Sequence, residues 1–265
     1  RKKPESEIIS EAKNMGIEMK FSYVVVAAKG YKKVNSAEIA NISEDKKDLG
    51  KIENITCDCI CVSGFWTPTI HLASQSGNKT KFNEEIDAFV PGKSKQNETT
   101  VGSANGIFSL EKTITTAFEK GHEISKKITS KNNKISVPQV SEKKFTQHDK
   151  FWCVPLPKEK NYKRFLDFQN DVTVSDVELA LREGYRSIEH VKRYTTLGMA
   201  TDQGKTSNLN GLQLVSSIEN KIVPSVGHTT FRPPYTPVSI GALVGREIGK
   251  HSKPTRKSPM HYWHE

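Results

Sequence analysis

Three cysteines at alternating positions, Cys57, Cys59 and Cys61, are the first residues whose type and spacing could do chemistry. In an extended strand such alternating side chains point to one face, so the three thiols would lie together. Clustered thiolates can bind a metal ion or undergo redox chemistry, but no second cysteine pair stands at zinc-ligand spacing. Because a free cysteine commonly behaves as a small buried hydrophobe, we expect buried thiols here and no metal site.

Gly204-Lys205-Thr206 resembles the end of a phosphate-binding P-loop. That motif has four residues between its glycines, whereas Gly198 and Gly204 enclose five, and the segment follows a predicted helix rather than a strand. Nucleotide triphosphate hydrolysis is therefore not expected. Two interpretations stay open: Lys205 and Thr206 hold a cofactor phosphate at a helix N-terminus, or the helix is merely capped and the lysine solvated. The sequence identifies no catalytic residue.

The first half of the chain has the pattern of an α/β domain. Residues 21–28 and 34–42 are β-rich runs around a basic turn with a glycine, which predicts a hairpin. Residues 55–63 are apolar at almost every position, which predicts a strand covered on both faces. The loop at the carboxyl end of such a strand is where an open α/β sheet binds ligands. Ser109 can cap a helix that Gly121 would end.

The second half has a helical pattern. A helix is expected from Thr173, with Asp176 as its capping partner, to Gly184. Further helices are expected over 188–194, capped by Ser187, and over 207–218. Residues 126–150 are lysine-rich with little periodicity, which indicates a linker. Together these elements predict a small helical module after an α/β domain.

Composition excludes several classes of protein. The 265 residues carry a net charge of +10 with a pI near 9.3. The excess is mainly lysine scattered among Asn, Ser and Glu, which favours a solvated surface over nucleic-acid binding. No run approaches the ~18 apolar residues of a membrane span. Four cysteines are too few for a disulfide scaffold, so a cytoplasmic setting and no membrane partner are expected.

Long motifs in the chain resemble the alpha subunit of heterotetrameric sarcosine oxidase. The resemblance lies in residues 57–77 (CDCICVSGFWTPTIHLASQSG), 165–208 (FLDFQNDVTVSDVELALREGYRSIEHVKRYTTLGMATDQGKTSN), 229–243 (TTFRPPYTPVSIGAL) and 256–265 (RKSPMHYWHE). It implies a central fragment, with the Gly-rich dinucleotide fingerprint upstream. The implied parts are the end of an NAD-binding, disulfide-reductase-like α/β domain (1–124), a linker (125–150), a small helical ferredoxin-like module (151–245) and the start of an aminomethyltransferase-like folate domain (246–265).

The resemblance also implies chemistry and partners. The family oxidises sarcosine to glycine, releases hydrogen peroxide and passes the one-carbon unit to tetrahydrofolate on the C-terminal domain. NAD would lie in this subunit, and FMN and FAD with the beta subunit; gamma and delta subunits complete the enzyme. In related modules the cysteines that bind an iron–sulfur cluster fall near Phe168, Asn170 and Asp202, none of which is a cysteine here, so no cluster is expected.

The resemblance assigns site residues as well. Val62, Ser63 and Gly64, with Thr67 to Thr69, would line the NAD site. Gly102, Ser103 and Ala104 would correspond to the Gly-Asp turn that meets a flavin's ribityl chain, with Ser103 in place of the aspartate. Independently of the resemblance, Lys205 and Thr206 stay candidates for a phosphate or flavin-proximal position because they precede a helix N-terminus. Two alternatives remain: a subunit of a related oxidase acting on another amine, such as an opine or dimethylglycine, and a non-catalytic scaffold.

Overall fold

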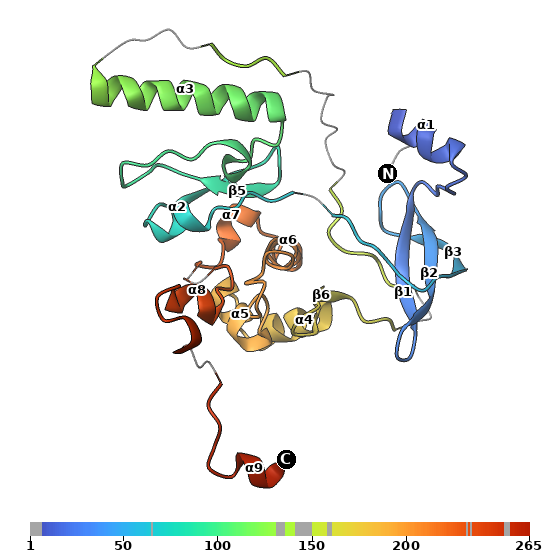
Figure 1. The fold of residues 1–265 in the computed structure, drawn as a ribbon. Helices are drawn as coiled ribbons and strands as arrows, with labels where there is room; N and C mark the ends of the chain where they lie inside the picture. The colour runs from blue at the N-terminus through green and yellow to red at the C-terminus, as the bar shows by residue number, and fades with distance from the viewer. Residues whose placement is uncertain are drawn as a thin grey trace.

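The computed structural model describes residues 7–64, 66–130, 136–140, 150–157, 161–231, 233, 235–251 and 255–265, with only the backbone at 250. Of the expected linker, residues 131–135 and 141–149 lie outside the described residues. All three sheets that the described residues form are antiparallel. Figure 1 shows a blue sheet at one side of the molecule and the remaining elements stacked beside it.

The blue sheet follows helix α1 (Glu7–Asn14) and has the order β1 (Tyr23–Gly30), β2 (Val34–Ile42), β3 (Leu49–Thr56). The predicted hairpin is confirmed as β1 and β2. Its turn requires glycine at Gly30, because φ is +147° and an added Cβ would overlap the Lys33 carbonyl oxygen. Ala37, Ile39 and Ala40 of the central strand are buried and form the core of this sheet.

The strand predicted over 55–63 is wrong beyond Thr56. β3 pairs with β2 alone among the described strands, and the hydrogen bonding ends where the Cys57 N–H donates to the Asn35 carbonyl oxygen at 3.1 Å. The following residues have no regular structure, and Cys59 and Cys61 are exposed while Cys57 is half-buried. The expectation of buried thiols is therefore wrong, because an apolar run is covered only where a neighbouring strand or helix packs on it.

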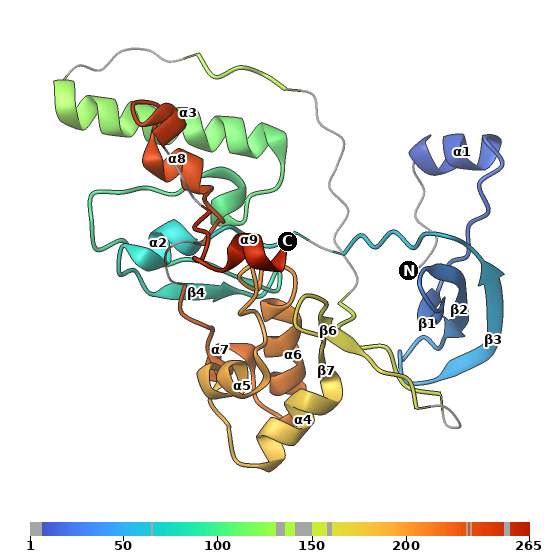
Figure 2. The same cartoon turned by 60° about the horizontal axis from the view of Figure 1, so that its bottom comes forward.

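The next unit holds a short hairpin between two helical elements. It contains α2 (His71–Gln75), β4 (Thr80–Asn83), β5 (Ala88–Pro91), the 3₁₀ turn η1 (Gly102–Asn105) and α3 (Leu110–Thr129). Ser109 caps α3 as predicted, since its side chain accepts from the Lys112 N–H at 3.2 Å. The helix runs through Gly121 instead of ending there, so residues 125–129 are helical. In both views α3 lies on the far side of this hairpin from the helical module (Figures 1 and 2).

The helical module contains β6 (Phe165–Asp167), β7 (Val172–Thr173), α4 (Val174–Arg182), α5 (Ile188–Thr195), α6 (Asn208–Ile218) and α7 (Val223–Val226). The three predicted helices correspond to α4, α5 and α6. Thr173 and Asp176 form the expected capping box, whereas Ser187 makes no side-chain cap bond. The buried core consists of Leu166, Val172, Val174, Val177, Ala180, Leu181, Ile188, Val191, Leu197, Leu212, Leu214, Val215 and Val223.

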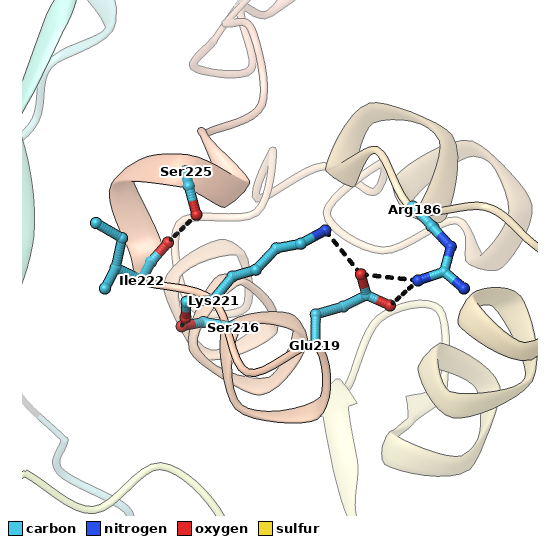
Figure 3. A network of polar contacts seen from close by, with 6 residues as sticks. All are labelled: Arg186, Ser216, Glu219, Lys221, Ile222 and Ser225. Carbon is cyan, nitrogen blue, oxygen red and sulfur yellow. Dashed lines mark hydrogen bonds and ion pairs between the residues drawn. The ribbon is translucent and has the colours of Figure 1, made fainter.

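An ion network lies at the C-terminus of α6 (Figure 3). Glu219 accepts hydrogen bonds from Arg186 at 2.9 Å and from Lys221 at 2.8 Å. Its side chain is 9% exposed, so these two cations cover it. The network ties the turn after α4 to the C-terminus of α6.

The remaining elements are α8 (Ile240–Val244), η2 (Gly249–His251) and α9 (His261–His264). α8 and α9 bury no residue. None of the helices in the described part of the chain is long and apolar enough to cross a bilayer. The described residues also contain no group of three or more His, Cys, Asp and Glu side chains placed to hold a metal ion.

Candidate functional site

The loop between α5 and α6 is held by a buried carboxylate. Asp167, 2% exposed at the end of β6, accepts the Gly198 N–H at 2.8 Å. It also accepts the N–H groups of Gln169 and Asn170 at 2.9 and 3.1 Å. A buried carboxylate is stable when several N–H donors satisfy it. Asp167 therefore joins the β6–β7 turn to the loop that leads into α6.

Asn208, the first residue of α6, lies in a cradle of two glycines. Gly198 and Gly204 have φ of +67° and +73°, and a Cβ added at either would overlap the Asn208 side chain. Its Oδ1 atom is buried and finds no hydrogen-bond partner within the described residues; the same holds for Ser207 Oγ. An unmatched buried acceptor is costly, so a bound group or water that donates an N–H or O–H would stabilise this position.

Asn208 lines a cavity of about 270 Å³ between α5, the loop before α6, residues 229–231 and Tyr235. Charged side chains border it: Glu189, Lys192 and Arg193. Arg193 pairs with Glu189 at 3.1 Å, and Glu189 also accepts the Thr230 N–H at 2.6 Å. The cavity therefore combines an unmatched acceptor with a rim of mixed charge, in which Glu189 already pairs with Arg193, a set suited to a small polar ligand.

A second cavity, about 60 Å³, adjoins the first on the other side of Asn208 and Tyr235. Lys205 donates to the Tyr235 carbonyl oxygen at 3.2 Å, with its Nζ 4.4 Å from the ring centroid. His71 stacks on the same ring at 4.2 Å. Burial and then the nearby Lys205 charge lower the pKa of His71, which favours its neutral form. Burial and then Asp202 raise the pKa of Tyr235, so its hydroxyl stays protonated.

The structure brings some predicted site residues together and leaves others apart. Thr67 and Lys205 line the same smaller cavity. Pro68 approaches the η1 turn, since a Cβ at Gly106 would lie 3.7 Å from Pro68 Cγ. Val62, Ser63, Gly64 and Thr69 are exposed and line neither cavity.

The remaining predicted positions have structural contacts. Gly102 is buried against α3, where a Cβ would lie 2.9 Å from Thr113 Cγ2, while Ser103 is exposed and Ala104 half-buried. Thr206 is exposed and its hydroxyl donates to Asp202 Oδ2 at 3.0 Å. Lys205 is exposed, but its ammonium group donates to the Tyr235 carbonyl oxygen. It is therefore neither fully solvated nor unoccupied.

Sequence reasoning missed Asp167, Asn208 and Tyr235. Asp167 had a signal, because an acidic residue at the end of an apolar strand often bonds nearby backbone groups. The two glycines on either side of the loop were visible, but the spacing alone does not show that an asparagine fills the space between them.

The fold resembles that of a solved dehydrogenase structure. The crystal structure of L-proline dehydrogenase from P. horikoshii aligns with a TM-score of 0.52 and 20% sequence identity, covering 89% of this chain and 47% of that chain. At this identity the likeness concerns the fold alone.

The sequence similarity is more specific. The chain is 38% identical over 241 residues to the sarcosine oxidase subunit alpha of Rhizobium meliloti (strain 1021), covering 91% of this chain and 23% of that subunit. The corresponding subunit of Corynebacterium sp. (strain P-1) is 33% identical over 266 residues, covering 98% and 27%, and that of strain U-96 is 34% identical over 235 residues, covering 86% and 24%.

Residues 161–246 match the family model of the sarcosine oxidase A3 domain, a range that contains all residues lining the larger cavity. The expected resemblance to sarcosine oxidase alpha subunits is confirmed. The chain spans about a quarter of the length of the curated relatives that it matches.

Proposed function

We propose that this chain is the central part of the alpha subunit of a sarcosine oxidase, an oxidoreductase that acts on the CH–NH group of a secondary amine. The observation that supports the proposal is similarity to three such subunits along 86–98% of the chain. The whole enzyme would convert sarcosine to glycine, release hydrogen peroxide and transfer the one-carbon unit to tetrahydrofolate. It would act in the cytoplasm with beta, gamma and delta subunits.

The larger cavity supports a flavin at this subunit. The imide N–H of a flavin ring is a donor of the kind that Asn208 Oδ1 lacks. Lys205 lines only the adjoining smaller cavity, and Thr206 lines neither, so these two residues would meet the phosphate only if the cofactor extends past Asn208. The volume of about 270 Å³ is below the ~300–1,000 Å³ of most ligand pockets, so the cavity would hold one part of the cofactor. This agrees with FMN shared between alpha and beta subunits; bound there, it would carry electrons from the amine toward oxygen.

NAD is proposed along Val62, Ser63, Gly64, Thr67 and Thr69, beside the turn of Gly102, Ser103 and Ala104. The described residues do not enclose a dinucleotide: most of this strip is exposed, and the cavity that Thr67 lines is about 60 Å³. They fit one side of such a site at most, and we assign NAD no step.

The test is to assemble the full-length alpha subunit with its beta, gamma and delta partners and to assay peroxide release with sarcosine, dimethylglycine and an opine. Sarcosine-dependent release is expected. Turnover of another amine alone would favour a related oxidase, and a well-assembled complex that oxidises none of them would favour the scaffold. Titration of NAD with and without the beta subunit tests the dinucleotide separately.

The flavin role of the cavity is tested with Asn208→Leu in the assembled enzyme. Loss of one buried hydrogen bond is worth ~1–1.5 kcal/mol, so FMN retention should fall about tenfold. Asn210→Ala is the matched control, because Asn210 lies on the same helix and bonds to the Thr206 carbonyl oxygen without lining the cavity. Equal FMN content in both variants would remove Asn208 from the site.

A further inference from the structure

Two thiols lie close together on an exposed stretch outside the proposed cofactor cavities. Cys59 Sγ and Cys61 Sγ are 3.8 Å apart, and both residues are exposed. They follow the last hydrogen bond of the β2–β3 ladder, which the Cys57 N–H makes. Neither residue lines the cavities around Asn208 and Lys205.

The geometry suits a bond between the two sulfur atoms. A disulfide has an S–S length of about 2.05 Å, so the sulfurs need to approach by less than about 2 Å. Rotation about the Cα–Cβ bonds, together with adjustment of a backbone that lies beyond the strand ladder, can supply such a movement. We propose that Cys59 and Cys61 form a reversible disulfide when the chain meets a hydroperoxide.

The reaction balances with one hydroperoxide per pair. One thiolate attacks the peroxide, an S–O bond forms, the O–O bond breaks, and the leaving oxygen departs as water once it takes up a proton. The second thiol then attacks the sulfenic sulfur, an S–S bond forms and a second water leaves. Two thiols are oxidised and one hydrogen peroxide is reduced to two waters. Hydrogen peroxide is a product of the proposed function, but any hydroperoxide suffices, so the two proposals can fail separately.

The two sulfurs also influence each other. The hydrogen bond with Cys61, together with the charge it would carry, raises the pKa of the Cys59 thiol above its ordinary value of 9.0. The attacking species is the thiolate, so oxidation should be slow near neutral pH and accelerate in alkaline solution. Exposed disulfides in short loops are the more easily reduced ones, which makes the oxidation reversible by a dithiol.

The other two cysteines provide matched controls. Cys57 is half-buried and its backbone is fixed in the ladder, whereas Cys153 is half-buried in a different segment, where its Sγ accepts from Arg164 Nη1 at 3.2 Å. Trypsin leaves the first three cysteines in one peptide, residues 52–79, and Cys153 in another. Mass spectrometry can therefore assign the bond.

The experiment treats the purified chain with equimolar hydrogen peroxide, alkylates the remaining thiols and compares the wild type with Cys57→Ser, Cys59→Ser, Cys61→Ser and Cys153→Ser. We expect peptide 52–79 to lose two alkylation sites and two hydrogens, with recovery by dithiothreitol. Cys59→Ser and Cys61→Ser should abolish this internal bond, and the other two variants should keep it. Circular dichroism checks that each variant is folded. A bond to Cys57, a disulfide between chains, sulfinic acid, or no oxidation would each overturn the proposal.

Discussion

At the scale of single residues, the Asn208 side chain fits because two neighbouring residues are glycines without a Cβ atom. Gly198 and Gly204 both hold backbone conformations that favour glycine, and both leave room for the amide only because they carry no Cβ. The buried Asp167 fixes the Gly198 N–H from the opposite side. Two glycines and a buried carboxylate thus determine where the Asn208 oxygen lies.

This arrangement predicts that Gly198→Ala lowers the free energy of unfolding by more than backbone strain alone would. Alanine at positive φ costs about 1–2 kcal/mol, and overlap with Asn208 Oδ1 adds roughly 1–3 kcal/mol. Gly184→Ala is the control: Gly184 has φ of +96° but nothing within 4 Å of an added Cβ. Urea unfolding of both variants measures the difference. Equal losses of stability would show that Asn208 moves aside without cost.

The residues that the sequence predicted correctly act locally. Thr173, Asp176 and Ser109 cap helices within three positions of themselves, so spacing alone identifies them. Thr67 and Lys205 line one cavity although 138 positions separate them. The sequence did not predict that these two residues meet, and it did not identify Asn208, because tertiary packing determines which side chains share a cavity and which atom remains without a partner.

At the scale of elements, the caps of α4 and α5 give a direct comparison. Thr173 accepts the Asp176 N–H and Asp176 accepts the Thr173 N–H, whereas Ser187 makes no side-chain cap bond. Thr173→Ala should therefore lower the free energy of unfolding by about 1 kcal/mol, and Ser187→Ala by clearly less. Thermal unfolding of the two variants measures this, and a larger loss for Ser187→Ala would contradict the assigned caps.

The stability that Glu219 contributes at the C-terminus of α6 should depend on pH. Hydrogen bonding from Lys221, together with the Arg186 charge, holds the pKa of Glu219 below its ordinary value of 4.5. A carboxyl whose pKa is lower in the folded state stabilises the fold above its unfolded pKa, and this contribution is lost as the pH falls through the folded value. The stability difference between wild type and Glu219→Gln should thus shrink on acidification from about pH 6 to pH 3.

Urea midpoints across this range measure the effect of Glu219. Glu119→Gln on the exposed surface of α3 serves as the control, and its curve should run nearly parallel to that of the wild type. A difference between wild type and Glu219→Gln that stays constant with pH would show that the Lys221 and Arg186 contacts do not stabilise the carboxylate.

Two predictions about elements are wrong because the residue type alone does not decide where a helix or strand ends. Gly121 was expected to end α3, but glycine inside a helix costs only about 1 kcal/mol relative to alanine, and the helix continues to Thr129. Residues 57–63 were expected in a strand because of their apolar character, yet a strand forms only where a neighbour supplies hydrogen bonds. The helices of residues 174–218 were predicted well because their apolar spacing agrees with a buried face, although only α4 has a side-chain cap bond.

At the scale of the whole molecule, two of the buried apolar clusters among the described residues lie in different parts of the chain. One lies in the β1–β3 sheet around Ile39, and the other in the helical module. The segment before β6 connects them: Lys150 donates to the Glu84 carbonyl oxygen at 3.2 Å and pairs with Asp87 at 3.1 Å, while Tyr162 bonds with Glu38. These contacts are polar and add no apolar core between the two parts, so the two cores should unfold with little coupling.

The β4–β5 hairpin, in contrast, belongs to the helical core. Phe82 and Phe89 pack against that core and against each other, with ring centroids 5.2 Å apart. Truncating Phe89 removes apolar contact with helices more than 80 positions away in the sequence. Phe89→Ala should therefore destabilise α4 and α6 by about 2 kcal/mol and leave β1–β3 unchanged.

Amide hydrogen exchange with residue resolution can measure both effects in one experiment. In Phe89→Ala, protection should fall in α4 and α6 by about thirtyfold, the factor that corresponds to ~2 kcal/mol. Ile39→Ala, which opens the sheet core, should lower protection in β1–β3 instead. A uniform loss in either variant would mean that the two cores unfold as one cooperative unit, and that the bridging contacts of Lys150 and Tyr162 couple them strongly.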